Sequence, residues 1–212
     1  MTETPEPELA DPDGTLLAGA AAGDAATVDL AVRAGADLEA RDAHQRTALL
    51  LAATGDHVHA AKVLVAAGAD PDALDDRSDT PWLVTGVTGS VAMAEVLLTA
   101  NPDLTIRNRF GGISIIPAAE RGHVEYLRRV LQTDIDVNHV NDLGWTALLE
   151  AVILGDGGQR HQETVRLLLE AGADPAIADR EGVTPLEHAR SRGYAEIDGL
   201  LSWPVSGDCP DP

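Results

Sequence analysis

The 212-residue sequence predicts an all-α solenoid of six helix-turn-helix repeats joined by short β-turn fingers. Three observations predict this fold class. Similar segments recur at a spacing of 33 residues, apolar residues recur at helical spacing within each segment, and glycines stand where helices should end. Hydrophobic residues make up 44% of the chain and aromatic residues only 3%, which favours a repetitive core of small aliphatic side chains.

The register of the repeats predicts the domain organisation. The repeats begin at residues 14, 47, 80, 113, 146 and 184, so four steps of 33 residues precede one of 38. We therefore expect a disordered acidic tail over 1–12, a repeat domain over 13–201 and a C-terminal tail over 202–212, with Trp203 covering the exposed end of the last repeat. The extra five residues, 156–160, fall between the two helices of the fifth repeat.

Each repeat carries start signals for its first helix and stop signals for its second. A threonine side chain can cap the first helix by accepting a backbone N–H bond, and a proline suits the first helical position. A glycine or asparagine in the left-handed conformation can end the second helix, and a segment such as 37–46 then projects as a finger. The threonines are Thr47, Thr80, Thr146 and Thr184, the prolines are Pro81 and Pro185, and the stop residues are Gly35, Gly68, Asn101 and Gly172.

Several positions depart from the repeat pattern. Ile113 stands where the capping threonine is expected, which should cost roughly 1 kcal/mol of local helix stability. Asp56 occupies the place of a mid-repeat glycine, with Gly55 one residue early. Trp82 replaces a leucine at a core position and is expected to pack in the interior. None of these changes should upset the fold, because stacking area outweighs single caps.

The 33-residue period, with Thr-Pro-Leu at its head and Ala-Gly-Ala-Asp at its end, resembles the ankyrin repeat over about residues 13–201. The segments 108–112 and 144–151, with the insert, look like a group of small bacterial ankyrin-repeat proteins. The histidine that ankyrin repeats often carry three residues after the threonine is absent, so apolar packing must substitute for it. The resemblance implies a non-enzymatic protein-interaction module that binds a protein or peptide in a concave groove lined by the fingers and the first helices.

Charge and composition narrow the choice of partner. The net charge of −20 and pI near 4.4 oppose binding to nucleic acid and to anionic membranes. Residues 1–12 lack the basic start and apolar centre of a secretory signal, and no apolar run is long enough to span a bilayer. Cys209 is the only cysteine and implies no disulfide. We expect a cytoplasmic monomer without a cofactor.

The predicted partner-binding residues lie on the finger tips and on the exposed side of the first helices. Phe110 and Trp145 occupy turn positions that should face solvent, and aromatic residues beside arginines are typical anchors of interfaces. The alternative is that these rings fold back onto a neighbouring finger. The predicted set is Arg77, Arg109, Phe110, Glu120, Arg121, Asp142, Leu143, Trp145, Glu150, Ile153, Arg180 and His188.

Two of these residues leave alternatives open. Glu150 and His188 stand at the fifth position of adjacent repeats, where leucine is commoner, so each places a polar group on a half-buried face that requires a partner. Either they bind one another or neighbouring backbone, or they await a ligand.

Two other functions deserve comparison with the interaction module. One is an enzyme that uses Glu150, Asp156, His161 and His188 as acid–base groups at the rim of the insert. The other is a small-anion receptor built on the amides of the glycine-rich insert, although the strand and lysine of a phosphate loop are missing. His57, His123 and His161 recur at one repeat position, but stacked elements about 8–10 Å apart would hold them too far from one another to share a metal ion.

Overall fold

The computed structural model describes residues 9–202, in which there are twelve helices and no strand. The chain divides into two compact units between Arg109 and Phe110. The helices of the first unit are α1 (Pro12–Ala22), α2 (Ala25–Arg33), α3 (Ala48–Thr54), α4 (Val58–Ala67), α5 (Pro81–Thr88) and α6 (Val91–Leu98). Those of the second unit are α7 (Ile115–Glu120), α8 (Val124–Val130), α9 (Ala147–Ile153), α10 (Gln159–Glu170), α11 (Pro185–Arg192) and α12 (Ala195–Ser202). Trp203 and most of the two predicted tails lie outside the described residues.

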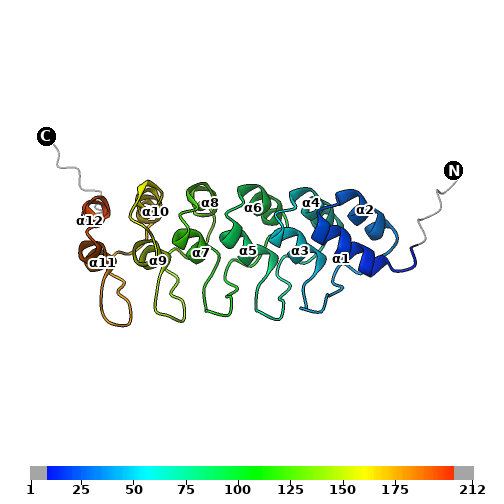
Figure 1. Cartoon of the computed structure of the whole chain (residues 1–212), viewed down its shortest axis with the longest axis horizontal. Coiled ribbons are helices and arrows are strands. Elements are labelled where there is room, and N and C mark those ends of the chain that lie inside the picture. Colours follow the sequence, from blue (N-terminus) through cyan, green and yellow to red (C-terminus); the bar gives the residue numbers. More distant parts are fainter. Residues whose placement is uncertain (1–8, 203–212) are drawn as a thin grey trace. The chain divides into compact units, whose positions relative to one another are not determined.

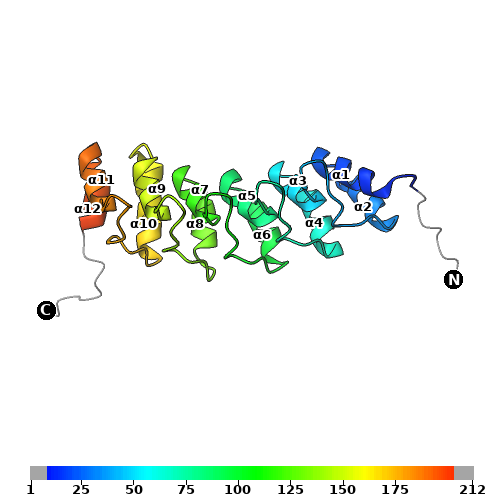
Figure 2. The same cartoon turned by 90° about the horizontal axis from the view of Figure 1, so that it is seen from below.

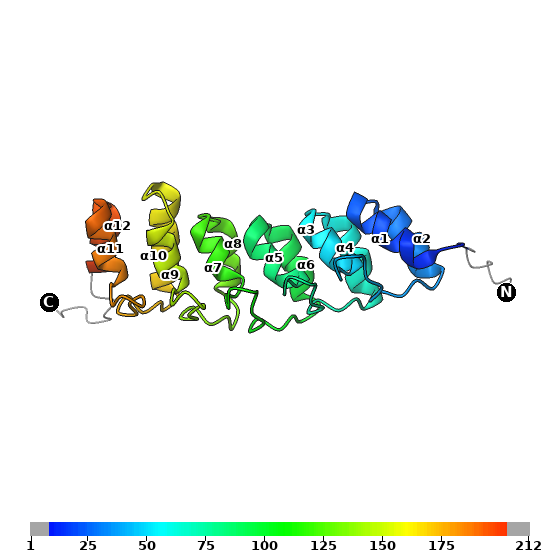
Figure 3. The same cartoon turned by 60° about the horizontal axis from the view of Figure 1, so that its bottom comes forward.

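Both units are built from two layers of helices. In the first unit α3 packs between α1 and α5, and α4 packs between α2 and α6. In the second unit α9 packs between α7 and α11, and α10 packs between α8 and α12. Within each unit, Figures 1, 2 and 3 show the odd-numbered helices as one layer and the even-numbered helices as the other. We call these the first and second layers, and we call the loops that extend beyond the first layer the finger loops (Figure 1).

The predicted threonine caps are confirmed. The side chains of Thr47, Thr80 and Thr146 accept hydrogen bonds from the backbone N–H three residues later, at 3.3, 3.1 and 3.2 Å. Thr184 makes the same bond at 3.3 Å, and the Glu187 carboxylate accepts in return from the Thr184 N–H at 2.8 Å. This reciprocal arrangement is a capping box, which satisfies two donors at the start of α11.

Two first-layer helices begin elsewhere than the repeat register predicts. The first starts at Pro12 rather than near Gly14, because the Asp11 carboxylate accepts from the Gly14 N–H at 2.9 Å and proline suits the first helical position. The α7 helix starts at Ile115, since Ile113 cannot cap and Ser114 makes no capping bond. The Ser114 hydroxyl is buried without a hydrogen-bond partner. With six residues, α7 is the shortest helix of the described chain.

The residues predicted to end the second-layer helices adopt the left-handed conformation. The φ angles of Gly35, Gly68 and Gly172 are 81°, 94° and 91°, and Asn101 has a φ of 55°. Asp56, which stands in place of a mid-repeat glycine, also has a positive φ of 52°. Side chains other than glycine therefore occupy this strained region in the first unit, where asparagine and aspartate are the least costly choices.

The core is made of alanine and leucine, as the composition predicts. Ala52, Ala53, Leu64 and Leu97 are fully buried, and Trp82 is 1% exposed, which confirms its predicted place in the interior. Where ankyrin repeats often carry histidine, this chain buries apolar side chains instead: Leu50, Leu83, Ile116 and Leu149. Small residues allow the two layers to approach closely, and this positions the finger loops on rigid supports.

Candidate functional site

The finger loops share one construction, in which an Asp or Asn side chain holds the turn. The Asn141 Oδ1 atom accepts from the N–H groups of Leu143 and Trp145, both at 3.0 Å. The Asp179 Oδ1 atom accepts from the residues two and four places later, at 3.0 and 2.8 Å. Asp42 and Asp75 do the same in the first unit. Each of these four loops therefore presents the residue two places after its Asp or Asn at its tip, and Phe110 has the same repeat position, two places after Asn108.

The residues at this tip position differ between loops in polarity but not in exposure. Two consecutive tips, Phe110 and Leu143, are apolar. Their side chains are nevertheless 53% and 51% exposed. The prediction that Phe110 faces solvent is confirmed. Large apolar side chains held in water at adjacent, equivalent sites form a surface suited to contact with another molecule. The full set of tip residues is His44, Arg77, Phe110, Leu143 and Glu181, all exposed.

The two apolar tips are joined through the backbone. The Asp142 N–H donates to the Phe110 carbonyl at 2.9 Å, and the Arg180 guanidinium donates to the Asp142 carbonyl. Gly111 has a φ of 71°, and a Cβ atom there would lie 2.3 Å from the Asp142 carboxylate. Glycine is required at this position, both for the backbone angle and for the close approach of the next loop. Phe110, Asp142, Leu143 and Arg180 are thus held in one connected surface.

Glu150, at the fifth position of the repeat on α9, is linked to the loop that presents Leu143. Its side chain is buried, and its Oε1 atom accepts from the Asn141 Nδ2 group at 3.0 Å. Burial, reinforced by the nearby Glu120 carboxylate, raises the pKa of Glu150 to about 7. Asn141 thereby links the Glu150 carboxyl to the loop that presents Leu143 and Trp145.

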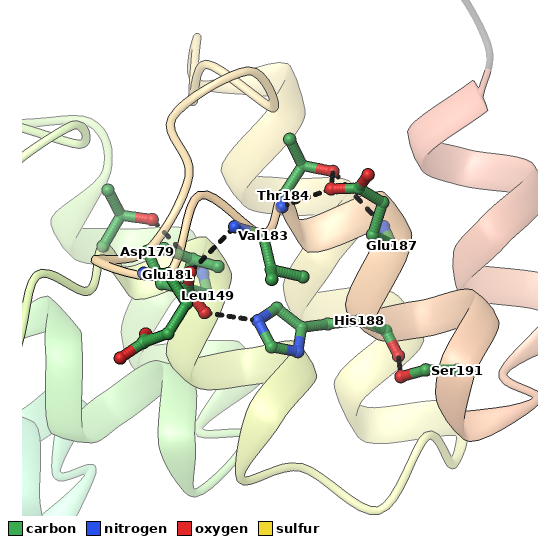
Figure 4. Close-up of polar contacts among 9 residues, drawn as sticks. Leu149, Asp179, Glu181, Val183, Thr184, Glu187, His188 and Ser191 are labelled. Carbon is green, nitrogen blue, oxygen red and sulfur yellow. Dashed lines mark hydrogen bonds and ion pairs between the residues drawn. The ribbon is translucent and has the colours of Figure 1, made fainter.

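His188 occupies the equivalent position on α11 and binds its own finger loop. Its Nε2 atom lies 2.7 Å from the Asp179 Oδ2 atom (Figure 4). The pKa of Asp179 is lowered by the hydrogen bond from the Val183 N–H and further by His188. Glu150 and His188 therefore do not bind one another: each contacts the Asp or Asn that holds the preceding loop. The sequence left open whether these two residues bind groups of the protein or await a ligand. Both bind groups of the protein, and the partners are side chains of the finger loops, not backbone.

The insert is shorter as a loop than predicted, because Gln159 and Arg160 belong to α10. His161 is nearly buried, with its Nε2 atom 2.9 Å from the Glu120 carbonyl and its Nδ1 atom 2.7 Å from the Asp156 carboxylate. His57 makes the equivalent bond to the Ala21 carbonyl at 3.1 Å in the first unit. This repeat position therefore joins neighbouring repeats by a histidine-to-carbonyl bond.

Two amides of the insert are bonded to side chains close by in the chain. The Gly158 N–H donates to the Asp156 carboxylate at 2.9 Å, and the Asp156 N–H faces the His161 Nδ1 atom at 3.3 Å. The ring of Tyr194 packs against Gly157, where a Cβ atom would lie 2.5 Å from it. A carboxylate at the centre of the turn opposes an anion there, so the arrangement gives little support to an anion receptor.

The remaining predicted residues are spread over both units. Trp145 is half-buried rather than fully exposed, so it contributes to packing as well as to the surface. Glu120 is half-buried, Arg121 is exposed at the end of α7, and Ile153 is half-buried at the end of α9. Arg77 and Arg109 belong to the first unit, where Arg109 lies 4.0 Å from the Asp79 carboxylate.

Sequence reasoning missed the residues that support this surface. Asn141 and Asp179 were not among the predicted site residues, although Asp or Asn recurs five residues before the start of each later repeat, at 42, 75, 108, 141 and 179. That recurrence was the available signal. His139 was also missed: it is 9% exposed, and its Nε2 atom lies 2.7 Å from the Gly111 carbonyl, which fixes the loop beneath Phe110.

No group of three or more His, Cys, Asp or Glu side chains over 9–202 is placed to hold a metal ion. None of the helices in that range is both long enough and apolar enough to cross a membrane.

The chain is similar in sequence to proteins built from ankyrin repeats. The family model described as ankyrin repeats (3 copies) matches residues 15–108, 87–179 and 115–202. The ankyrin repeat protein YahD of Escherichia coli (strain K12) is 52% identical over 101 residues, which are 47% of this chain and 50% of that protein. The matched segments thus span half or less of the length of the curated relatives.

Solved structures match over nearly the whole described chain. An ankyrin repeat domain from Acinetobacter baumannii AYE has a TM-score of 0.85 and 47% identity, covering 88% of this chain and 95% of that one. The ankyrin repeat protein EF0377 has a TM-score of 0.86 and 36% identity, covering 90% and 97%. Ankyrin repeats are generally protein–protein interaction modules and generally not enzymes. The sequence period, the helical fold and these matches together place the chain in the ankyrin repeat family.

Proposed function

We propose that this chain is a non-enzymatic protein-interaction module that binds a protein or peptide on the finger loops and first-layer helices of its second unit. The observation that carries the proposal is the pair of apolar tips, Phe110 and Leu143. They occupy one repeat position on consecutive loops, both about half exposed, and the Asp142 N–H bond to the Phe110 carbonyl holds the loops together. A partner that covers both side chains gains apolar burial without having to order the loops.

The support beneath the tips favours a preformed surface. Asn141 holds the turn that carries Leu143 and also binds Glu150, while His139 binds the Gly111 carbonyl next to Phe110. These contacts fix the backbone before a partner arrives, which lowers the entropy cost of association. Arg180, Glu120 and Ile153 extend the proposed contact area, and Arg77 and Arg109 are proposed contacts on the first unit.

The acid–base groups of the enzyme alternative have structural partners. Glu150 binds Asn141, His188 binds Asp179, and His161 lies between the Asp156 carboxylate and the Glu120 carbonyl. A catalytic base must reach a substrate, and here both ring nitrogens of His161 are engaged. This supports an interaction module over an enzyme. Turnover that is lost on Glu150→Gln without loss of folding would favour the enzyme instead.

Site-specific photo-crosslinking tests the proposed surface. A benzoylphenylalanine placed at position 143 of the full chain should capture a distinct partner in cells, because the side chain at this tip is exposed and lies beside Phe110. The same reporter at position 44 is the matched control, since His44 has the same repeat position and is also exposed. Its carbonyl accepts from the Asp76 N–H at 3.2 Å, as the Phe110 carbonyl accepts from the Asp142 N–H. Capture from position 44 alone, or equal capture from both, would contradict the proposed surface.

A further inference from the structure

A groove on the second layer lies away from the finger loops, between α10 and α12. Its volume is about 800 Å³, and it is open along one side. Leu169 and Leu200 contribute apolar surface, and Glu163, Glu170 and Glu196 stand along its edges; Gln159, Gln162, Arg166 and Gly199 complete the lining. Both helices belong to the second unit.

The equivalent groove in the first unit, between α4 and α6, can be compared with the α10–α12 groove in volume and in lining residues. The groove between α4 and α6 is lined by Lys62 and Glu95, which have the same repeat position as Arg166 and Gly199. Its volume is about 420 Å³, roughly half as large. The second helices of the other repeats carry a long or charged residue at this position: Asp29, Lys62, Glu95, Arg128 and Arg166. Only the last repeat has glycine there.

Gly199 is an unfavourable residue for a helix interior, and no packing contact requires it. Apart from proline, glycine is the least favourable residue in a helix. A Cβ atom at Gly199 would meet nothing within 4 Å, so glycine does not relieve a clash. Its effect is to leave open the space between α12 and α10, beside Leu200 and Leu169.

The charges around the groove indicate which occupant fits. The lining residues include three glutamates and one arginine, and Arg166 is already paired with Glu163 and Glu170. Contacts with Arg166 and Arg128 lower the pKa of Glu163 to about 2, so that carboxylate is ionised at neutral pH. Glu170 and Glu196 are exposed on opposite sides of the groove, one on each helix. The edges therefore attract a cationic group.

We propose that the α10–α12 groove is a second docking site, for a segment of another protein that carries apolar side chains flanked by lysine or arginine. The apolar side chains occupy the space over Gly199, and the basic groups meet Glu196 on α12 and the cluster of Glu163, Arg166 and Glu170 on α10, whose net charge is −1. A second copy of this chain fits less well, because each copy carries a net charge of −20. The chain's own residues 203–212 contain Asp208 and Asp211 and no lysine or arginine, so the same charges oppose them.

The experiment measures the fluorescence anisotropy of the full-length protein with a short labelled peptide in which a pair of leucines is flanked by lysines. We expect saturable binding, at least tenfold weaker binding by Gly199→Gln, and severalfold weaker binding by Glu170→Gln/Glu196→Gln. Gly199→Gln should keep the circular dichroism spectrum and raise the melting temperature, since glutamine favours helix. Glu95→Gln, the change at the equivalent position of the α4–α6 groove, is the matched control and should bind like wild type.

Three results would overturn the proposal. The first is loss of selectivity, seen as equal binding by Gly199→Gln and wild type or as equal binding of a peptide with glutamates in place of the lysines. The second is a dimer in sedimentation that Gly199→Gln abolishes, which would assign the groove to a second copy. The third is broadening of the Gly199 and Leu200 amide resonances by a spin label on Cys209, which would assign it to the chain's own C-terminal segment.

Discussion

The finger loops of the two units have the same backbone and different surfaces. In both units an Asp or Asn side chain holds the turn, and the N–H of one loop donates to the tip carbonyl of the loop before it, as Asp76 does to His44 and Asp142 to Phe110. In the first unit these tips are His44 and Arg77, whereas in the second they are Phe110, Leu143 and Glu181, of which the first two are apolar. The scaffold is therefore constant, and side chains at one position determine what each unit can bind.

The fifth position of the first-layer helices differs in the same way. It holds Ala18, Leu51 and Val84 in the first unit, whereas in the second it holds Pro117 and then two polar residues, Glu150 and His188. Two loops of the second unit therefore gain an additional bond to a helix: Asn141 donates to Glu150, and Asp179 accepts from His188. The comparison teaches that polar groups on this face do not by themselves indicate catalysis, since here they support the loops that carry the exposed residues.

The largest effect should come from removing the apolar tips. We expect Phe110→Ala and Leu143→Ala each to cost about 2 kcal/mol or more of partner affinity, because truncated hot-spot residues lose buried apolar contact. Thermal unfolding should hardly change, since both side chains are half exposed. Titration calorimetry with the captured partner measures the loss, and His44→Ala is the control. Unchanged affinity together with a lowered melting temperature would mean that the tips are packing residues.

Trp145 should divide its effect between binding and stability. Because it is half-buried, Trp145→Ala should weaken binding by about 2 kcal/mol and also lower the free energy of unfolding, unlike the tip substitutions. Calorimetry and urea unfolding of the same variant separate the two losses. A loss confined to the free energy of unfolding would remove Trp145 from the proposed contact.

Glu150→Gln should stabilise the protein at alkaline pH. The folded-state pKa of Glu150 is about 7 against an ordinary value of 4.5, so between these values the folded protein holds a proton that the unfolded chain has released. The stability of the wild type therefore falls as pH rises through this window. We expect the variant to exceed wild type by about 2 kcal/mol at pH 8 and to match it near pH 4.5, in urea unfolding. Equal pH profiles would place Glu150 in a more hydrated site.

Exchanging the loop residues should sharpen the contrast between Asn141 and Asp179. Asn141→Asp would set a carboxylate against the Glu150 carboxyl, raise the pKa of Glu150 further and destabilise the protein by about 1 kcal/mol at pH 8 but less at pH 5. Asp179→Asn keeps an acceptor for the Glu181 and Val183 N–H groups and loses only the charge beside His188. Chemical denaturation at both pH values measures the difference. A larger loss of stability from Asp179→Asn than from Asn141→Asp would mean that the Asp179–His188 contact, and not the Asn141–Glu150 contact, contributes more to stability.

The smallest effect should come from the second layer. Arg129→Ala on α8 and Arg166→Ala on α10 should leave the affinity for the tip-binding partner within about 0.5 kcal/mol of wild type, because neither residue is on the finger loops or the first layer. A loss comparable to that of Phe110→Ala would move the contact to the second layer. The same calorimetric titration measures all these variants on one scale.

Much of the fold was predictable because the residues that start and end each helix lie within or next to that helix in the sequence. Threonine caps and left-handed glycines depend on a few neighbouring residues, so Thr47, Thr146 and Gly68 could be interpreted from the sequence. The start of α1 was predicted two residues late, since the Asp11–Pro12 signal lies before the repeat register. The insert was predicted as a loop, but its last two residues begin α10. A run of residues rich in glycine does not reveal where helical hydrogen bonds resume.

The sequence by itself determined the ankyrin repeat fold, the capping residues and the exposure of Phe110, because a 33-residue period repeats the same local rules in every copy. Only the tertiary structure decided which polar groups meet. Asn141 and Glu150 are nine residues apart, and Glu120 and His161 are 41 residues apart, so neither pairing follows from helical spacing. The width of the α10–α12 groove was likewise decided by packing, since one glycine creates space only when a second helix lies opposite it.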